Sequence, residues 1–246
     1  REALTMNFND ATYLATIKAI RDAIERTTNL IDDFTQTVSS FLVLKSIQIA
    51  WTIRESIARF KAAANLTLTL IREELKGYLA PILFFKRGAD WHNHVKGPMH
   101  KFAASVSSDK LLSADQWEGA AGNRYREATA DQKPAGEACA TIGSQMGTQL
   151  MWCAGGGLAF YTAIAVALGK FIVALVRCAA AATTGAGSIL APIAAAAASI
   201  ATTSQIIAAC VTLATFLTTQ VTTINQLNSV FSEFPYSHWP SGTSKK

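Results

Sequence analysis

The 246-residue sequence has little charge, and the shortage is concentrated in its C-terminal half. Charged residues make up 16% of the chain, against roughly 25% in ordinary soluble domains. No charged residue occurs between Cys178 and Ser232. Because the surface of a soluble protein normally carries mixed charges, we expect this half to be covered by other helices, other subunits or lipid.

Glycine and proline are absent from residues 1–76, and this absence favours uninterrupted helix. Apolar residues between Tyr13 and Phe41, and again between Ile53 and Leu75, alternate at spacings of three and four, as in one face of a helix. The two stripes are out of register near residues 41–51, where the helix either continues through a stutter or turns. Since no turn residue marks this junction, one long helix over 7–88 is favoured over a helix pair.

Other features that the sequence lacks exclude further classes of protein. The four cysteines (Cys139, Cys153, Cys178 and Cys210) form no CxxC pair, so buried reduced thiols are expected rather than a disulfide framework. The first residues contain no apolar segment typical of a classical signal peptide. No long stretch alternates between apolar and polar residues as a strand would. The predicted fold class is therefore all-α, an elongated antiparallel bundle of long helices.

The remaining organisation follows from turn residues. Residues 89–157 are expected to hold a connection up to 116, irregular except for a short helical piece near 99–107, and then a helix that restarts near residues 113–117. Pro134 should kink this helix, because proline removes a backbone hydrogen bond, and Gly155–Gly157 should interrupt it. Residues 158–230 read as an uncharged apolar helical hairpin with its turn at 183–188. Residues 231–246 should form an irregular tail.

The segment DQWEGAAGNRYREA (115–128) places a tryptophan beside a glycine between two helical stretches. A turn between antiparallel helices needs an apolar plug, and Trp117 can supply one. Gly119 would let the backbone approach closely, Ala120 and Ala121 would permit tight helix contact, and Tyr125 lies two turns further on the same face.

These residues resemble the WXG family of Esx-like type VII secretion substrates, in the form of a long actinobacterial member, over roughly residues 89–150. The resemblance implies a helix–turn–helix with the tryptophan at the bend, pairing into a four-helix bundle, and export without a signal peptide. Family members or their partners carry a Y-x-x-x-[DE] signal. Here Tyr125 is followed at the fourth position by Thr129, so a partner protein would have to carry that signal.

The uncharged half admits two interpretations. Residues 158–176 are close to the roughly 20 residues that span a bilayer core, although Lys170 would cost about 2.5–3.5 kcal/mol there. Alternatively, the alanine- and threonine-rich helices pack in a soluble oligomer. The residues expected on the membrane or assembly face are Ile164, Lys170, Phe171, Ile193, Ile200, Ile207, Thr212, Leu217 and Thr219.

Few residues suggest chemistry. Asp90, His92, His94 and His100 form a weak zinc-site candidate, for which a solvated loop is the favoured interpretation. No P-loop, GxGxxG, HExxH or GxSxG motif occurs, and no basic cluster interleaved with aromatic residues suggests nucleic acid. The chain is therefore expected to be non-enzymatic, with no cofactor and no nucleic-acid partner.

The sequence thus predicts a secreted or envelope-associated bacterial protein that forms homo-oligomers or pairs with a WXG-type partner. Its expected action is contact with membrane lipid, or insertion into it, with pore formation as the extreme case. The alternative is a soluble structural or carrier module, such as a secretion partner or the helical leader of a toxin.

Overall fold

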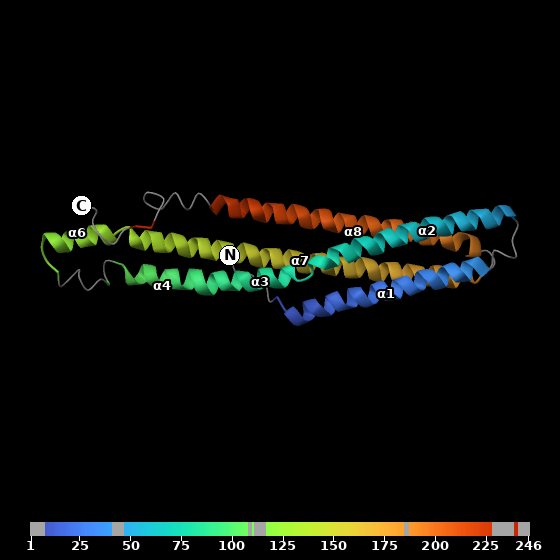
Figure 1. The fold of residues 1–246 in the computed structure, drawn as a ribbon, viewed down its shortest axis with the longest axis horizontal. Coiled ribbons are helices and arrows are strands. Elements are labelled where there is room, and N and C mark those ends of the chain that lie inside the picture. The colour runs from blue at the N-terminus through green and yellow to red at the C-terminus, as the bar shows by residue number, and fades with distance from the viewer. Residues whose placement is uncertain are drawn as a thin grey trace. The chain divides into compact units, whose positions relative to one another are not determined.

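The computed structural model describes residues 8–40, 47–107, 110, 117–184, 187–227 and 239–240. All regular structure within them is helical, which confirms the all-α class (Figure 1). The α-helices are α1 (Asp10–Ser40), α2 (Ile47–Glu74), α3 (Ala80–Asp90), α4 (Gly97–Ser105), α6 (Ala120–Thr129), α7 (Gln132–Ala182) and α8 (Gly187–Gln226). A 3-10 turn (Leu75–Gly77) follows α2, and a π-helical turn (Trp91–Lys96) joins α3 to α4.

The helices group into two compact units. Unit 1 comprises the described residues of 81–155 and 216–246, and unit 2 comprises the described residues of 8–80 and 156–215. Helices α7 and α8 each contribute residues to both units. The two units are described separately below.

The N-terminal region of unit 2 is a helix pair, so the expectation of one long helix is wrong. Helix α1 ends at Ser40 and α2 begins at Ile47. The rings of Phe34 and Phe60 pack edge to face with centroids 5.3 Å apart, whereas one straight helix would separate these residues by about 40 Å. The two apolar stripes differ in register because each helix faces a shared core. The junction itself, residues 41–46, lies outside the described residues.

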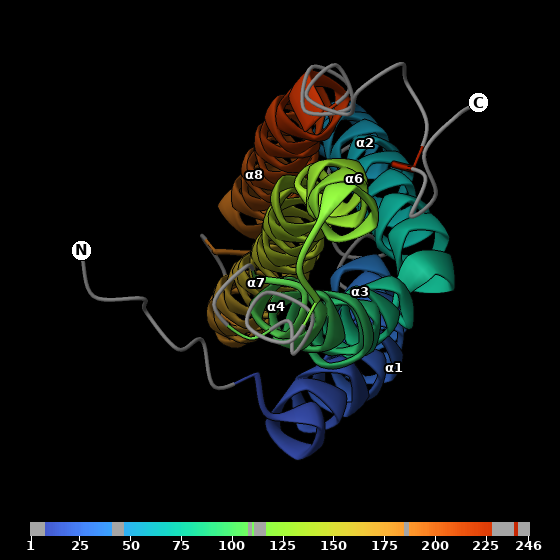
Figure 2. The same cartoon turned by 90° about the vertical axis from the view of Figure 1, so that its left-hand side faces the viewer.

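The core of unit 2 lies between four helices. Helices α1 and α2 pack with the later part of α7 and the earlier part of α8, and large side chains such as Phe34, Phe60 and Phe171 are almost completely buried between them. Within this unit, α7 and α8 lie on one side and α1 and α2 on the other (Figure 2). Asn9 caps α1, because its side-chain Oδ1 accepts from the backbone N–H of Ala11 at 2.9 Å.

Two buried tyrosines donate hydrogen bonds to backbone carbonyls where α2 ends. The Tyr161 hydroxyl donates to the Glu74 carbonyl at 2.8 Å, and the Tyr13 hydroxyl donates to the Tyr78 carbonyl at 2.6 Å. Carbonyls at a helix C-terminus lack intrahelical donors, so these phenols replace the missing partners. The two rings also contact each other, with centroids 5.8 Å apart. They therefore tie α1 and α7 to the same end of α2.

Replacing Tyr161 with phenylalanine should destabilise the protein by about 1 kcal/mol, the usual net value of such a hydrogen bond. Burial, and then Glu74, raise the pKa of Tyr161 from 10.0 to about 12. The unfolded chain therefore loses this proton first, and stability should fall as pH rises from 10 to 12. Urea unfolding across this range should show a shallower decline for Tyr161→Phe than for wild type. Tyr125→Phe, on the half-buried ring of α6, is the control and should leave the decline unchanged.

In unit 1, the connection contains more helix than expected, because helix was expected there only near residues 99–107. The chain is helical from Ala80 to Ser105 and so continues through Lys86, Arg87 and Gly88, where the first helix was expected to end. This segment packs antiparallel to the start of α7 through glycines. An added Cβ at Gly147 would lie 2.8 Å from the Gly88 carbonyl oxygen, and one at Gly143 would lie 2.8 Å from the Lys96 nitrogen. The glycines that suggested a loop therefore permit close helix packing. Part of the expected connection, residues 108–109 and 111–116, lies outside the described residues.

The path through α6, α7 and α8 matches part of the sequence expectation. The helix is interrupted at residues 130–131, and Pro134 lies in the first turn of α7, where its missing N–H is tolerated. Gly155–Gly157 do not interrupt α7, which continues to Ala182. The turn expected at 183–188 lies between α7 and α8, although residues 185–186 are outside the described residues. Of the tail, only residues 239–240 are described, and Trp239 packs on Phe102 in unit 1.

Candidate membrane or assembly surface

Helices α7 and α8 both contain segments that could cross a membrane by length and composition. The apolar stretches lie within residues Ala120–Ala182 and Leu190–Gln226. In the most apolar 18-residue window, 44% of the residues are buried for the first stretch but only 11% for the second. Because the core of any soluble protein contains buried apolar helices, the apolar segment of α7 is weak evidence for membrane contact. The exposed helix α8 requires another explanation.

Helix α8 buries mostly small residues and exposes several large apolar ones. Its buried positions are mostly small, including Ala191, Ala195 and Ser199. Its outward positions carry the five side chains that we call the α8 ridge. Their exposed fractions are Leu190 65%, Ile193 49%, Ile200 60%, Ile207 50% and Val211 60%. An exposed apolar surface of this kind is typical of a binding or membrane-contacting site.

The residues expected on the membrane or assembly face do not all share it. Ile193, Ile200 and Ile207 belong to the α8 ridge. Thr212 and Thr219 are also exposed, and Leu217 is half-buried. Ile164 and Phe171, in contrast, are fully buried in the core of unit 2, because they project from the side of α7 that faces the bundle. These two residues are therefore not part of the exposed face.

Most of the described hydroxyl groups of α8 form hydrogen bonds within the helix. Each donates to the carbonyl four residues earlier, at 2.8 to 3.0 Å, in Ser199, Thr202, Thr203, Ser204, Thr212, Thr215, Thr222 and Thr223. A hydroxyl that is already bonded costs less to remove from water than a free one. The many threonines of α8 therefore do not prevent it from entering an apolar environment.

Helix α7 exposes a stripe beside α8. Val166, Val173 and Val176 are about half exposed, and Lys170 and Arg177 are exposed among them. A shallow groove of about 510 Å³ separates the two helices, with Lys170 of α7 and Gln205 of α8 among its lining residues. Lys170 therefore flanks α8 on its α7 side, and Arg177 lies two turns further along the same side of α7.

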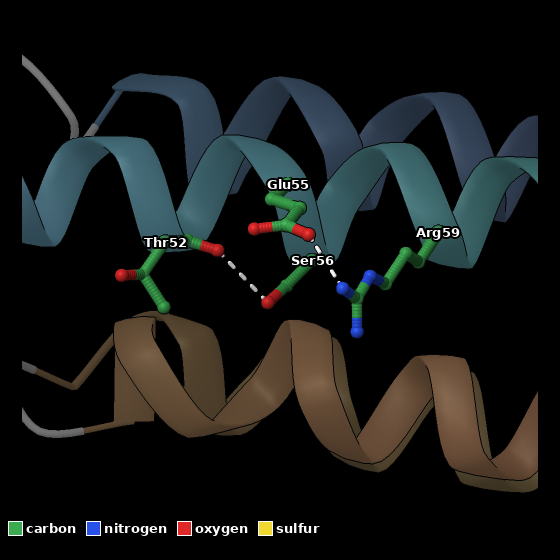
Figure 3. Close-up of polar contacts among 4 residues, drawn as sticks. All are labelled: Thr52, Glu55, Ser56 and Arg59. Atoms are coloured by element: carbon green, nitrogen blue, oxygen red, sulfur yellow. Dashed lines mark hydrogen bonds and ion pairs between the residues drawn. The ribbon is translucent and has the colours of Figure 1, made fainter.

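The other flank of α8 faces α2, where the charges are balanced. Glu55 and Arg59 form an ion pair at 2.5 Å along α2, next to α8 (Figure 3). Nearby, the Ser56 hydroxyl donates to the Thr52 carbonyl at 2.9 Å. Deeper between the helices, the Thr67 and Thr203 hydroxyl oxygens are 2.6 Å apart. Unit 2 thus combines two charged helices with two helices that carry almost no charge.

The tryptophan segment differs from the expected buried plug. Trp117 is 47% exposed, and Ala120 and Ala121 are exposed rather than in tight helix contact. Its ring does contact Tyr125, with centroids 5.7 Å apart, as their shared face predicts. Gly119 precedes α6 with a φ of 96°, a left-handed conformation that favours glycine. The close approach expected at Gly119 occurs instead at Gly122, which packs on the Trp117 carbonyl.

This geometry predicts that Gly119 matters more for stability than Trp117. Gly119→Ala should cost about 1–2 kcal/mol, because a Cβ strains the positive-φ conformation. Trp117→Ala should cost no more than about 1.5 kcal/mol, the value of an exposed aromatic pair. Urea unfolding of both variants checks the order. A loss of several kcal/mol for Trp117→Ala would restore the buried-plug interpretation.

The weak zinc candidates lie on helix rather than in a solvated loop. His94 Nδ1 lies 3.2 Å from the Asp90 carbonyl and 3.9 Å from its carboxylate. His92 packs against Gly147, and burial, followed by Lys96, lowers its pKa. Across the described part of the chain, no three histidine, cysteine, aspartate or glutamate residues, His100 included, come together as metal ligands.

The four cysteines are free thiols. Cys153 and Cys178 are buried, and Cys139 and Cys210 are half-buried. Burial raises the pKa of each thiol, so the reactive thiolate is disfavoured. Burial of the thiols is therefore as predicted at Cys153 and Cys178, whereas Cys139 and Cys210 are more exposed than the sequence suggests.

Comparison with known proteins adds no relative. No protein-family model, curated protein or solved structure matches the chain. The resemblance to the WXG family therefore rests only on Trp117, Gly119 and the residues around them.

Proposed function

We propose that this protein is a non-enzymatic helical protein that acts at membranes through the α8 ridge. The observation that supports this proposal is the exposure of Ile193, Ile200, Ile207 and Val211 on an uncharged helix. Completing the burial of four half-exposed aliphatic side chains would contribute roughly 4 kcal/mol. Because the hydroxyls of α8 are bonded within the helix, little of this gain is lost to desolvation.

The proposal extends to assembly and location. Helices α7 and α8 are each long enough to span a bilayer, and several inserted copies could surround a pore. The WXG-like segment favours a protein that is exported or held at the bacterial envelope. Such a protein would meet membrane lipid after export, and the exposed α8 ridge would contact that lipid.

Flotation with liposomes and release of a trapped dye, each at neutral and acidic pH, test this function. We expect the protein to float with the vesicles in at least one condition, and dye release would show insertion. Absence of both flotation and leakage at both pH values would refute the proposal.

A second candidate function is soluble assembly, as a structural or carrier module. Ile193, Ile200 and Ile207 repeat at intervals of seven residues on an exposed helix face, a spacing typical of helix–helix pairing. This function predicts a stable homo-oligomer, or a complex with a WXG-type partner, whose mass is the same with and without detergent. A mass that changes with detergent favours the membrane function instead.

A further inference from the structure

Two basic side chains stand beside the α8 ridge without a counter-charge. Lys170 and Arg177 are the only charged residues between 138 and 232. Within the described residues, neither forms an ion pair or a hydrogen bond. They are seven residues apart on α7, which places them on the same side of the helix, two turns and about 10 Å apart. This pair is therefore a local positive charge on an otherwise neutral surface.

The position of the pair relative to α8 matters. Lys170 lines the groove shared by the two helices, together with Val166 and Gln205, and Arg177 continues the same line. When an apolar ridge enters the acyl region, long basic side chains at its flank reach back to the phosphates. On the opposite flank, Arg59 is already paired with Glu55. The positive charge is therefore confined to the α7 side.

We infer that Lys170 and Arg177 bind the phosphates of anionic phospholipids while the α8 ridge is inserted, so that the surface selects negatively charged bilayers. This inference rests on the proposed membrane function and adds the lipid class. Charge complementarity supports it, because the surface carries two cations and no acid. A nucleic acid would meet aliphatic side chains where it needs basic and aromatic contacts.

The test is flotation with vesicles of phosphatidylcholine alone and of phosphatidylcholine mixed with phosphatidylglycerol. Each basic residue near an anionic surface contributes a factor of about five in binding. The double variant Lys170→Gln with Arg177→Gln should therefore bind the mixed vesicles about thirty-fold more weakly than wild type. Its binding to the neutral vesicles should not change. Both side chains are exposed, so melting temperatures should stay equal.

The matched control is Lys18→Gln with Arg26→Gln, which removes the same charge from exposed positions of α1. This variant should bind mixed vesicles within about two-fold of wild type. An equal loss in the control would mean that net charge alone governs binding, and would overturn the inference.

Flotation distinguishes failure of this inference from failure of the proposed membrane function. Equal binding of wild type to both kinds of vesicle, unaffected by salt, would overturn lipid selection and leave membrane contact standing. No binding to either kind would overturn both. Binding to mixed vesicles that weakens as salt is added, and weakens further in the Lys170 and Arg177 variant, would support the inference.

Discussion

The double substitution Ile200→Glu with Ile207→Glu is expected to reduce membrane binding at least a hundred-fold. Each isoleucine would contribute more than about 1 kcal/mol by completing its burial in lipid, and each carboxylate would add a desolvation cost of a few kcal/mol. The sum exceeds the roughly 2.8 kcal/mol that corresponds to a hundred-fold change. Both side chains are at least half exposed, so the unfolding free energy should change by no more than about 0.5 kcal/mol at each site.

The control for this prediction places two glutamates on the charged side of unit 2. Leu14 of α1 is 44% exposed, and Ala58 of α2 is exposed as well. Leu14→Glu with Ala58→Glu should leave flotation close to wild type, since neither position belongs to the α8 ridge. If both double variants float like wild type, the α8 ridge is not the membrane-contacting surface.

The second large effect concerns the glycines of α7 in unit 1. Gly143→Ala with Gly147→Ala should destabilise the protein by about 4 kcal/mol, since overpacking typically costs 1–3 kcal/mol at each site. The new Cβ atoms would meet backbone atoms at 2.8 Å, the Lys96 nitrogen and the Gly88 carbonyl oxygen. Backbone atoms of a packed helix cannot move aside as a side chain can. Urea unfolding followed by circular dichroism measures the loss.

Gly169, in the same helix, is the matched control. No atom lies within 4 Å of a Cβ added there. Gly169→Ala should therefore stabilise the protein by up to about 1 kcal/mol, because alanine is the better helix former. A loss of stability at Gly143 and Gly147 together with a gain at Gly169 would show that close packing, and not helix propensity, governs the effect at the first two glycines. Stabilisation by alanine at Gly143 and Gly147 would contradict the packing described for unit 1.

The sequence predicted individual helices better than it predicted their ends. The stripe from Tyr13 to Val38 is buried in α1 as its spacing indicates. The separation of α1 from α2 was missed because the sequence between them contains neither glycine nor proline. Helix was missed over residues 88–98 for the opposite reason, since Gly88, Gly97 and Pro98 suggest a loop. A glycine that permits close packing and one that ends a helix look the same in a sequence.

The candidate surface was predicted in part. The absence of charge marks α7 and α8 as the unusual half, and the spacing of Ile193, Ile200 and Ile207 predicts the face that they share. Periodicity shows that residues share a face, but it does not show which neighbour covers that face. For this reason Ile164 and Phe171 were grouped with the α8 residues, although the bundle buries them.

By itself, the sequence determined the all-α class and the uncharged C-terminal half, because these depend on local composition and spacing. Only the tertiary structure decided which side of α8 is exposed and which basic residues flank it. It also decided that Trp117 is not a buried plug. Burial depends on contacts between residues far apart in the chain, such as Thr67 with Thr203. The local spacing of residues does not indicate such contacts. Which face of α8 is exposed therefore follows only from the packing of the bundle.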